Sequence, residues 1–254
     1  MERPIIIKGK HIGEGKPIIC VPVMGKTKNE IVESIKKMVN DKCEMIEWRV
    51  DAFEECNSVN ALKAVIEEVA PLLKDTLFVY TYRTKRQGGL GELPEDVVAD
   101  IRLAAAETGL VDFIDVEYFM IDHPRKIIKE LKKFDVHIIA SHHDFNDTPG
   151  NRIINSILEK MNDSGADVVK LAVMPQTMDD VMNLLIETNN FHNRYPKKPL
   201  ITMSMGKLGS VSRVIGEYVG ACVTFGAKEV ASAPGQLEYS ELNQVLNILH
   251  KAVE

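Results

Sequence analysis

The feature that most constrains the fold is a repeated alternation of short apolar runs and amphipathic segments. The run 17–23 comes first, and it is followed by a helical pattern that places Ile31, Ile35 and Met38 on one face. Short β-branched runs of this kind are typical of strands that are buried on both faces of a parallel sheet. The predicted strands are 17–23, 44–50, 76–82, 112–116, 136–141, 168–173, 200–205 and 221–225.

Eight strand–helix alternations in 254 residues, without a linker-like break, indicate an α/β fold of the closed (β/α)8 TIM barrel type. An open doubly wound sheet is the alternative, but it usually carries a glycine-rich phosphate turn after its first strand, and Met24-Gly25-Lys26 is no such turn. Segments 5–8 and 11–12 predict a short N-terminal β-hairpin. We therefore expect one domain, residues 1–254, with the hairpin in 1–16 and the barrel in 17–254.

Composition narrows the classes of function. A net charge of −6 and a pI near 5.7 argue against a general surface for nucleic acid or anionic membranes. Residues 1–16 show no signal peptide, and no stretch is long enough to span a membrane. The four cysteines lack CxxC spacing, so we expect reduced thiols in a cytoplasmic protein: Cys20, Cys43, Cys56 and Cys222.

Lys170 stands inside the apolar run 168–173. If this side chain projects from the interior of the sheet, loss of water disfavours its ammonium form. The neutral amine is the form that attacks carbonyl carbons to make a Schiff base. The alternative is a lysine at a strand end whose amine reaches water.

Other charged residues follow the predicted strands. Glu47 and Arg49 share one face of their strand because side chains alternate, while Trp48 points to the opposite face. Arg83 follows the third predicted strand, and the same alternation places it on the face that carries Thr81 and Val79. Because the carboxyl ends of barrel strands meet at one end of the barrel, we expect these residues to gather around Lys170.

Two histidines end the fifth strand. His142 and His143 are adjacent, so they point to opposite sides and make poor partners for one metal ion. One histidine that faces the barrel axis suits a general acid and base, since its ordinary pKa lies near working pH. We assign that position to His143 and expect His142 to be a hydrogen-bonded wall residue.

Two features after the seventh and eighth strands fit recognition of a small anion. Arg213, within Gly209-Ser210-Val211-Ser212-Arg213, can hold a carboxylate through two parallel hydrogen bonds. The alternative is an exposed arginine on the helix that the pattern predicts over 211–219. The segment 232–236 supplies small and polar groups on a loop that could close over a ligand.

These residues occur in one order that closely resembles the type I 3-dehydroquinate dehydratase family of the shikimate pathway, from about Pro17 to the C-terminus. The motifs that carry the resemblance are Glu47-Trp48-Arg49, Tyr82-Arg83-Thr84-Lys85-Arg86-Gln87-Gly88-Gly89, Ser141-His142-His143-Asp144-Phe145, Val168-Val169-Lys170-Leu171-Ala172-Val173, Thr202-Met203-Ser204-Met205-Gly206, Ser212-Arg213 and Ser232-Ala233-Pro234-Gly235-Gln236.

The resemblance implies a (β/α)8 barrel, commonly a homodimer, that needs neither a metal nor an organic cofactor. It implies that Lys170 forms an imine with the ketone of 3-dehydroquinate, and that His143 removes the acidified proton and assists loss of water. It further implies that substrate is bound by Arg213, Ser232, Gln236, Glu47, Arg49 and Arg83. Nearby positive charge is then expected to add to the effect of burial on the Lys170 amine.

One departure from the family pattern concerns the histidine. The family usually carries a glutamate before the two glycines, hydrogen-bonded to the catalytic histidine, and Gln87 occupies that position here. An amide can orient an imidazole, but it does not stabilise the imidazolium by charge. We therefore predict a pKa for His143 that is lower than is usual in the family, and slower proton transfer.

Two other functions remain open. A class I aldolase also uses a lysine imine in a barrel, but it cleaves a sugar phosphate and needs a phosphate-binding site after strands seven and eight. The segment 232–236 contains only one glycine for such a site. A ligand-binding barrel that has lost catalysis through Gln87 would bind dehydroquinate without forming an imine.

Overall fold

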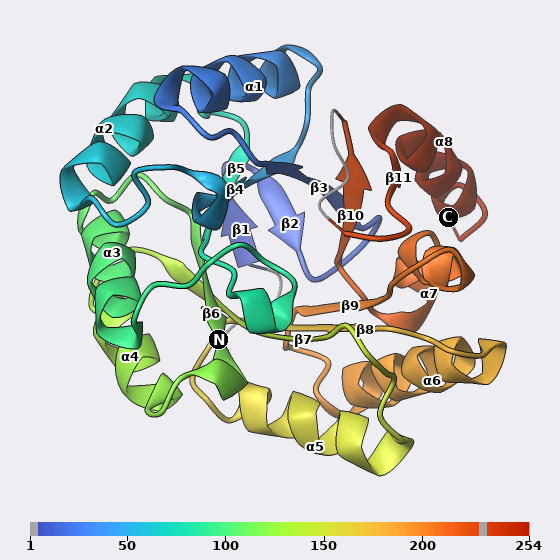
Figure 1. Cartoon of the computed structure of the whole chain (residues 1–254). Coiled ribbons are helices and arrows are strands. Elements are labelled where there is room, and N and C mark those ends of the chain that lie inside the picture. Colours follow the sequence, from blue (N-terminus) through green and yellow to red (C-terminus); the bar gives the residue numbers. More distant parts are fainter. Residues whose placement is uncertain (1–4, 229–232, 254) are drawn as a thin grey trace.

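The structure, a computed structural model, describes residues 5–228 and 233–253. A ring of parallel strands lies at its centre and helices form an outer ring around it (Figure 1). The barrel strands are β3 (Ile18–Val23), β4 (Met45–Arg49), β5 (Leu77–Thr81), β6 (Phe113–Glu117), β7 (His137–Asp144), β8 (Val168–Val173), β9 (Leu200–Ser204) and β10 (Val223–Ala227).

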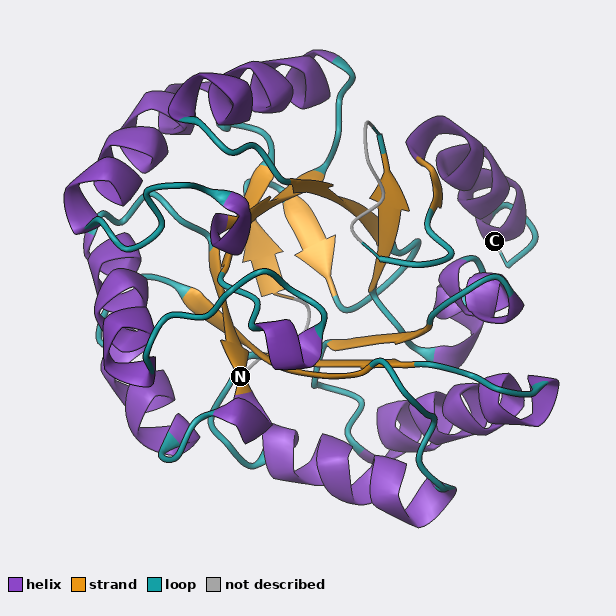
Figure 2. Ribbon diagram, viewed as in Figure 1, coloured by secondary structure: helices purple, strands orange, loops and turns teal. Residues whose placement is uncertain are grey.

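The strands pair in chain order, and each neighbour runs parallel to the next from β3 to β9, with β10 beside β3. The ring is completed between β9 and the residues before β10. Leu200 and Ala221 form a parallel bridge there, and the Cys222 amide donates to the Leu200 carbonyl at 2.8 Å. A short strand, β11 (Leu237–Glu238), pairs with β10. The predicted (β/α)8 barrel is confirmed (Figure 2).

Helices follow the barrel strands and cover their outer faces (Figure 2). The first helix begins with the capping box that the sequence contains, because Thr27 and Glu30 each bond the backbone of the other. The α-helices are α1 (Lys28–Asn40), α2 (Val59–Val69), α3 (Glu95–Glu107), α4 (Pro124–Leu131), α5 (Asn151–Asn162), α6 (Met178–Arg194), α7 (Gly216–Val219) and α8 (Tyr239–His250). The 3-10 helices are η1 (Val50–Ala52), η2 (Ala70–Leu72), η3 (Lys85–Gln87), η4 (Tyr118–Met120) and η5 (Leu208–Arg213).

The helix predicted over 211–219 is wrong, because this segment forms η5 and the four-residue α7. The reason lies at the end of β9. A side chain at Gly209 would meet the Ser204 carbonyl oxygen at 2.2 Å, so the turn approaches the strand closely. The Ser212 hydroxyl accepts from the Ser204 amide at 2.9 Å and donates to the Gly209 carbonyl at 2.7 Å. These bonds hold the segment against the barrel and aim Arg213 inward.

The N-terminal hairpin is confirmed as β1 (Ile5–Ile7) and β2 (Lys10–Ile12), which are antiparallel. Ile5 and Ile12 are buried in one apolar cluster with Ile18, Met45 and other residues at the beginnings of the barrel strands. The hairpin therefore covers the end of the barrel where the strands begin. The opposite end is left for the site.

Side-chain alternation on β4 follows the sequence pattern. Trp48 is fully buried between the strands and the helices, where it packs edge-on against Tyr80 with ring centroids 5.7 Å apart. Glu47 and Arg49 point to the opposite face and line the cavity inside the barrel. One strand thus supplies both an aromatic anchor for the outer core and charged groups for the interior.

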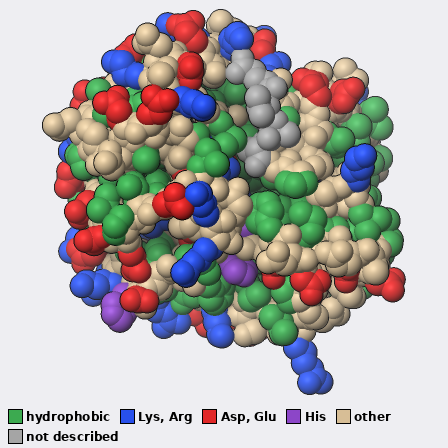
Figure 3. Space-filling model, in the orientation of Figure 1, with side chains coloured by type: hydrophobic (Ala, Val, Ile, Leu, Met, Phe, Trp, Pro, Cys, Tyr) green, Lys and Arg blue, Asp and Glu red, His purple; other side chains and the backbone are tan. Residues whose placement is uncertain are grey.

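The surface shows mixed charge, and Figure 3 shows Lys and Arg side chains interspersed with Asp and Glu over the visible face. None of the helices in residues 5–228 and 233–253 is long and apolar enough to cross a membrane.

Helix α5 offers a matched test of core packing. Leu158 is fully buried, whereas Ile153 on the same helix is 57% exposed. We expect Leu158→Ala to lower the free energy of unfolding by about 2–5 kcal/mol, because a cavity replaces buried methyl groups. Ile153→Ala should change it by less than about 0.5 kcal/mol. Urea unfolding with unchanged m-values measures both, and equal stability of the two variants would contradict this packing.

Candidate active site

A cavity of about 40 Å³ lies at the carboxyl ends of the barrel strands. The lining comprises Glu47, Arg49, Arg83, Gln87, Gly88, His143, Phe145, Lys170, Ala172, Met203, Met205, Phe225, Ala233 and Gln236.

Lys170 projects into this cavity and is 3% exposed, so the prediction of an interior lysine is confirmed and the solvent-reaching alternative is wrong. Its Nζ lies 3.4 Å from Glu47 Oε1 and 4.1 Å from the ring centroid of Phe225. Thr81 donates to the same Glu47 oxygen at 3.0 Å and fixes it. The positive charges expected near Lys170, those of Arg49 and Arg83, line the same cavity, and the Glu47 carboxylate opposes them there.

Arg83 is held on three sides by acceptors from β6 and β7. Its guanidinium contacts Asp115 at 2.9 Å, Glu117 at 3.0 Å and the Ser141 hydroxyl at 3.0 Å. Burial lowers the pKa of Arg83, but the carboxylates of Asp115, Glu117 and Glu47 outweigh it and raise that pKa above its ordinary value. Burial raises the pKa of Asp115, but the charge of Arg83 outweighs it and leaves that pKa below its ordinary value.

The carboxylate of Asp51 accepts hydrogen bonds from the loop between β5 and α3. Arg49 donates to its two oxygens at 2.8 and 2.7 Å, a bidentate pair. The backbone amides of Arg83 and Leu90 donate to the same carboxylate at 3.1 and 2.9 Å. Burial raises the pKa of Asp51, and the hydrogen bonds and charge of Arg49 outweigh it, so this pKa is lowered. The loop between β5 and α3 is thereby fixed to β4.

The two glycines of this loop allow close packing. Gly88 has φ +77°, and a side chain there would meet the Phe145 ring at 2.2 Å. A side chain at Gly89 would meet the Arg83 carbonyl oxygen at 2.1 Å. The turn therefore presents the preceding residue, Gln87, to the end of β7.

Gln87 bridges both histidines. Its Oε1 accepts from the His143 amide at 2.9 Å and lies 3.1 Å from His143 Nδ1, while its Nε2 lies 3.2 Å from His142 Nδ1. An amide oxygen only accepts and an amide nitrogen only donates. In this arrangement His143 carries its proton on Nδ1 and keeps the lone pair of Nε2, and His142 accepts at Nδ1. His142 also packs edge-on against Phe119, which confirms a hydrogen-bonded wall residue.

Arg213 is fully buried behind the cavity and is not an exposed helix-face arginine. Its guanidinium donates to the carbonyls of Pro234 at 3.0 Å and Phe225 at 3.3 Å, and burial lowers its pKa to about 10. The Gly206 amide also donates to the Pro234 carbonyl at 3.1 Å. Arg213 and Gly206 therefore both hold the segment 233–236 through Pro234. Gln236 lines the cavity. Ser232, the remaining predicted contact, lies outside the described residues.

Comparison with known proteins agrees with this geometry. Residues 19–253 match the family model of type I 3-dehydroquinase. The 3-dehydroquinate dehydratase of Clostridioides difficile strain 630 is 42% identical over the full length of both chains. A crystal structure of the type I enzyme from Clostridium difficile with covalently modified comenic acid has a TM-score of 0.95, and covers 99% of this chain and 100% of its own. The enzyme from Geobacillus kaustophilus reaches the same TM-score at 28% identity, with full coverage of both chains.

The chain belongs to the type I 3-dehydroquinase family.

Sequence reasoning identified the charged and polar residues that line the cavity of this type I 3-dehydroquinase but missed the groups that hold them. Asp51 and Asp115 carry the counter-charges of the two cavity arginines, and neither was predicted. Asp115 alternates with apolar residues inside β6, and the same parity that placed Arg49 inside the barrel also places Asp115 there. That parity was the available signal.

The pKa of His143 is strongly perturbed by its surroundings. Burial lowers its pKa well below the ordinary value, and the positive charges of Arg83, Lys170 and Arg49 lower it further, with a contribution from His142. Burial also lowers the pKa of His142. Gln87 supplies no negative charge to oppose these effects, so the imidazole of His143 stays neutral at pH 7.

We expect NMR titration of His143 to give a pKa below the ordinary value of about 6.5. In Gln87→Glu the added carboxylate should raise this pKa by about one unit or more, because an opposite charge within hydrogen-bond distance favours the imidazolium. The acidic limb of kcat/KM should move in the same direction, since a base works only when unprotonated.

Gln244→Glu is the matched control, because it makes the same change at an exposed position of α8. It should leave the titration of His143 unchanged. A His143 pKa at or above the ordinary value in the unsubstituted protein would contradict the electrostatic account.

Proposed function

We infer that the protein is a 3-dehydroquinate dehydratase, a hydro-lyase that converts 3-dehydroquinate to 3-dehydroshikimate and water. The observation that carries this is a buried amine, Lys170, in one cavity with a neutral histidine, His143, whose unprotonated nitrogen is set by a hydrogen bond to Gln87. The family membership and the 42% identity to a 3-dehydroquinate dehydratase support the same reaction.

In this proposal Lys170 attacks the substrate ketone and forms an imine with loss of water. The imine nitrogen, once protonated, withdraws electrons and makes the adjacent C–H bond much more acidic. Glu47, 3.4 Å from the amine, offers a carboxylate beside the developing positive charge. Burial limits the water that would hydrolyse the imine before elimination.

His143 then acts as the base at its Nε2, because Nδ1 is bound to Gln87. It removes the acidified proton, and the resulting imidazolium donates a proton to the departing hydroxyl group in a syn elimination. Its low pKa makes it a weaker base but a stronger acid, so Gln87 favours the second step over the first. Hydrolysis of the imine releases the product and restores Lys170.

Recognition of the substrate carboxylate is assigned to Arg213. Backbone carbonyls are its only oxygen acceptors among the described residues, so a carboxylate that displaces the Pro234 carbonyl gains a full ionic partner. Such displacement moves the segment 233–236, which also enlarges the 40 Å³ cavity. Ser232 and Gln236 are proposed to close over the bound substrate.

The remaining cavity charges are assigned to the ring hydroxyls. Arg49 and Arg83 are fixed by carboxylates and so keep their orientation while substrate binds. Glu47 can accept a hydrogen bond from a hydroxyl through the same carboxylate that contacts Lys170. We also propose that the enzyme is a cytoplasmic homodimer; its four cysteines are all free thiols, which suits a reducing compartment.

Turnover of 3-dehydroquinate, followed by ultraviolet absorbance of the conjugated enone product, tests this function. Lys170→Met should lower kcat by about 10⁴-fold or more, since it removes the nucleophile. Lys160→Met, at an exposed position of α5, is the matched control and should retain full activity.

Sugar phosphates serve as the second substrate panel. Cleavage of a sugar phosphate without turnover of 3-dehydroquinate would identify an aldolase. Binding of 3-dehydroquinate without turnover would identify a barrel that has lost catalysis through Gln87.

A further inference from the structure

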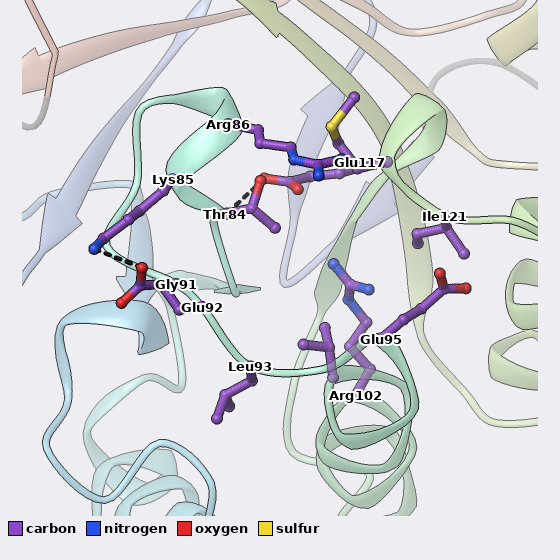
Figure 4. Close-up of a pocket in the computed structure, with 12 residues that line it drawn as sticks. Thr84, Lys85, Arg86, Gly91, Glu92, Leu93, Glu95, Arg102, Glu117 and Ile121 are labelled. Carbon is purple, nitrogen blue, oxygen red and sulfur yellow. Dashed lines mark hydrogen bonds and ion pairs between the residues drawn. The ribbon is translucent and has the colours of Figure 1, made fainter.

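A second and larger cavity of about 430 Å³ lies outside the barrel ring, between the β5–α3 loop, helix α3 and helix η4. The Arg83–Glu117 ion pair separates the two cavities, because Arg83 lines the catalytic cavity and Glu117 lines this one. We call this second, larger cavity the α3 cavity. Its lining comprises Thr84, Lys85, Arg86, Gly91, Glu92, Leu93, Glu95, Val98, Arg102, Glu117, Met120 and Ile121 (Figure 4).

Arg102 is the central cation of the α3 cavity. It is 2% exposed, and it makes no hydrogen bond or ion pair with any residue in 5–228 and 233–253, while its Nε is fully shielded from solvent. Figure 4 shows its guanidinium directed away from α3 into the space between Glu117 and Ile121. Burial lowers the pKa of this side chain. The carboxylates of Glu117 and Asp115 act on it electrostatically, but no described residue contacts it as an ion-pair partner.

Glu117 supplies an unused acceptor in the same cavity. Its Oε1 accepts from Arg83 at 3.0 Å and from the Thr84 amide at 2.9 Å. Its Oε2 is buried and has no hydrogen-bond partner among the described residues. Arg102 and Glu117 both line the α3 cavity, and they form no ion pair with each other.

The rest of the α3 cavity sets the character of an occupant. Leu93, Val98 and Ile121 line it with apolar side chains. At its mouth Lys85 and Glu92 form an exposed ion pair at 2.7 Å, so neither charge dominates the entrance. A volume of this size accommodates a small organic molecule, since such sites span about 300–1,000 Å³.

We propose that the α3 cavity is a binding site for a small carboxylate that has an apolar body and a hydrogen-bond donor next to the carboxylate group. The carboxylate pairs with Arg102, and the donor bonds Glu117 Oε2. The apolar body packs against Leu93, Val98 and Ile121. The proposal is independent of the reaction in the barrel.

Three probes separate the parts of this recognition in isothermal titration calorimetry. Mandelate carries a carboxylate, an adjacent hydroxyl and a phenyl group; phenylacetate lacks the hydroxyl; 1-phenylethane-1,2-diol lacks the carboxylate. We expect mandelate to bind at millimolar or lower concentration. Phenylacetate and the diol should each bind about tenfold or more weakly, because each leaves one buried charged group without its partner.

Two variants locate the site. Arg102→Met should weaken mandelate binding about tenfold or more, since it removes a charge-assisted hydrogen-bond donor. Ile121→Glu, which adds a negative charge to the cavity wall, should weaken it similarly. Arg152→Met replaces an exposed arginine on α5 and should leave binding unchanged. Thermal unfolding of Arg102→Met should give a Tm no lower than that of the unsubstituted protein, which shows that the variant is folded.

Absence of mandelate binding at millimolar concentration would overturn the proposal. Equal binding by the unsubstituted protein, Arg102→Met and Ile121→Glu would also overturn it, because the probe would then occupy another cavity. Neither result depends on turnover, so they are distinct from failure of the dehydratase assignment.

Discussion

The chemistry of this barrel depends on pairing charges that have been removed from water. An isolated ion is costly to bury, and three of the basic side chains at the carboxyl end of the barrel, Arg49, Arg83 and Lys170, lie beside carboxylates. Asp51 holds Arg49, Asp115 and Glu117 hold Arg83, and Glu47 lies beside Lys170. The resulting network is nearly neutral and rigid. It allows an amine, an imidazole and two guanidinium groups to share one cavity.

The network also explains the position of the histidine. Asp51 fixes the β5–α3 loop through two backbone amides, and the close turn at the two glycines sets Gln87 against the end of β7. Gln87 then orients His143 but places no negative charge beside it. His142 completes the arrangement, because its lone pair selects which end of the amide faces His143. A glutamate in place of Gln87 has two equivalent acceptors and needs no such selection.

The parts of the fold with a strong periodic pattern could be predicted from sequence. The barrel, its hairpin and the inward direction of Lys170, Glu47 and Arg49 follow from strand length and side-chain alternation. The segment after β9 could not, because its path is set by hydrogen bonds between Ser212 and the end of β9. The partners of Arg83 also required coordinates, since pairing across β5, β6 and β7 depends on register.

The central claim is that Lys170 forms a covalent imine with the substrate in this cavity. Treatment with 3-dehydroquinate and sodium borohydride, followed by mass spectrometry of the proteolytic peptides, tests it directly. The account predicts one stable adduct, on the peptide that contains Lys170. An active enzyme in which Lys170 stays unmodified, or in which another lysine carries the adduct, would contradict it.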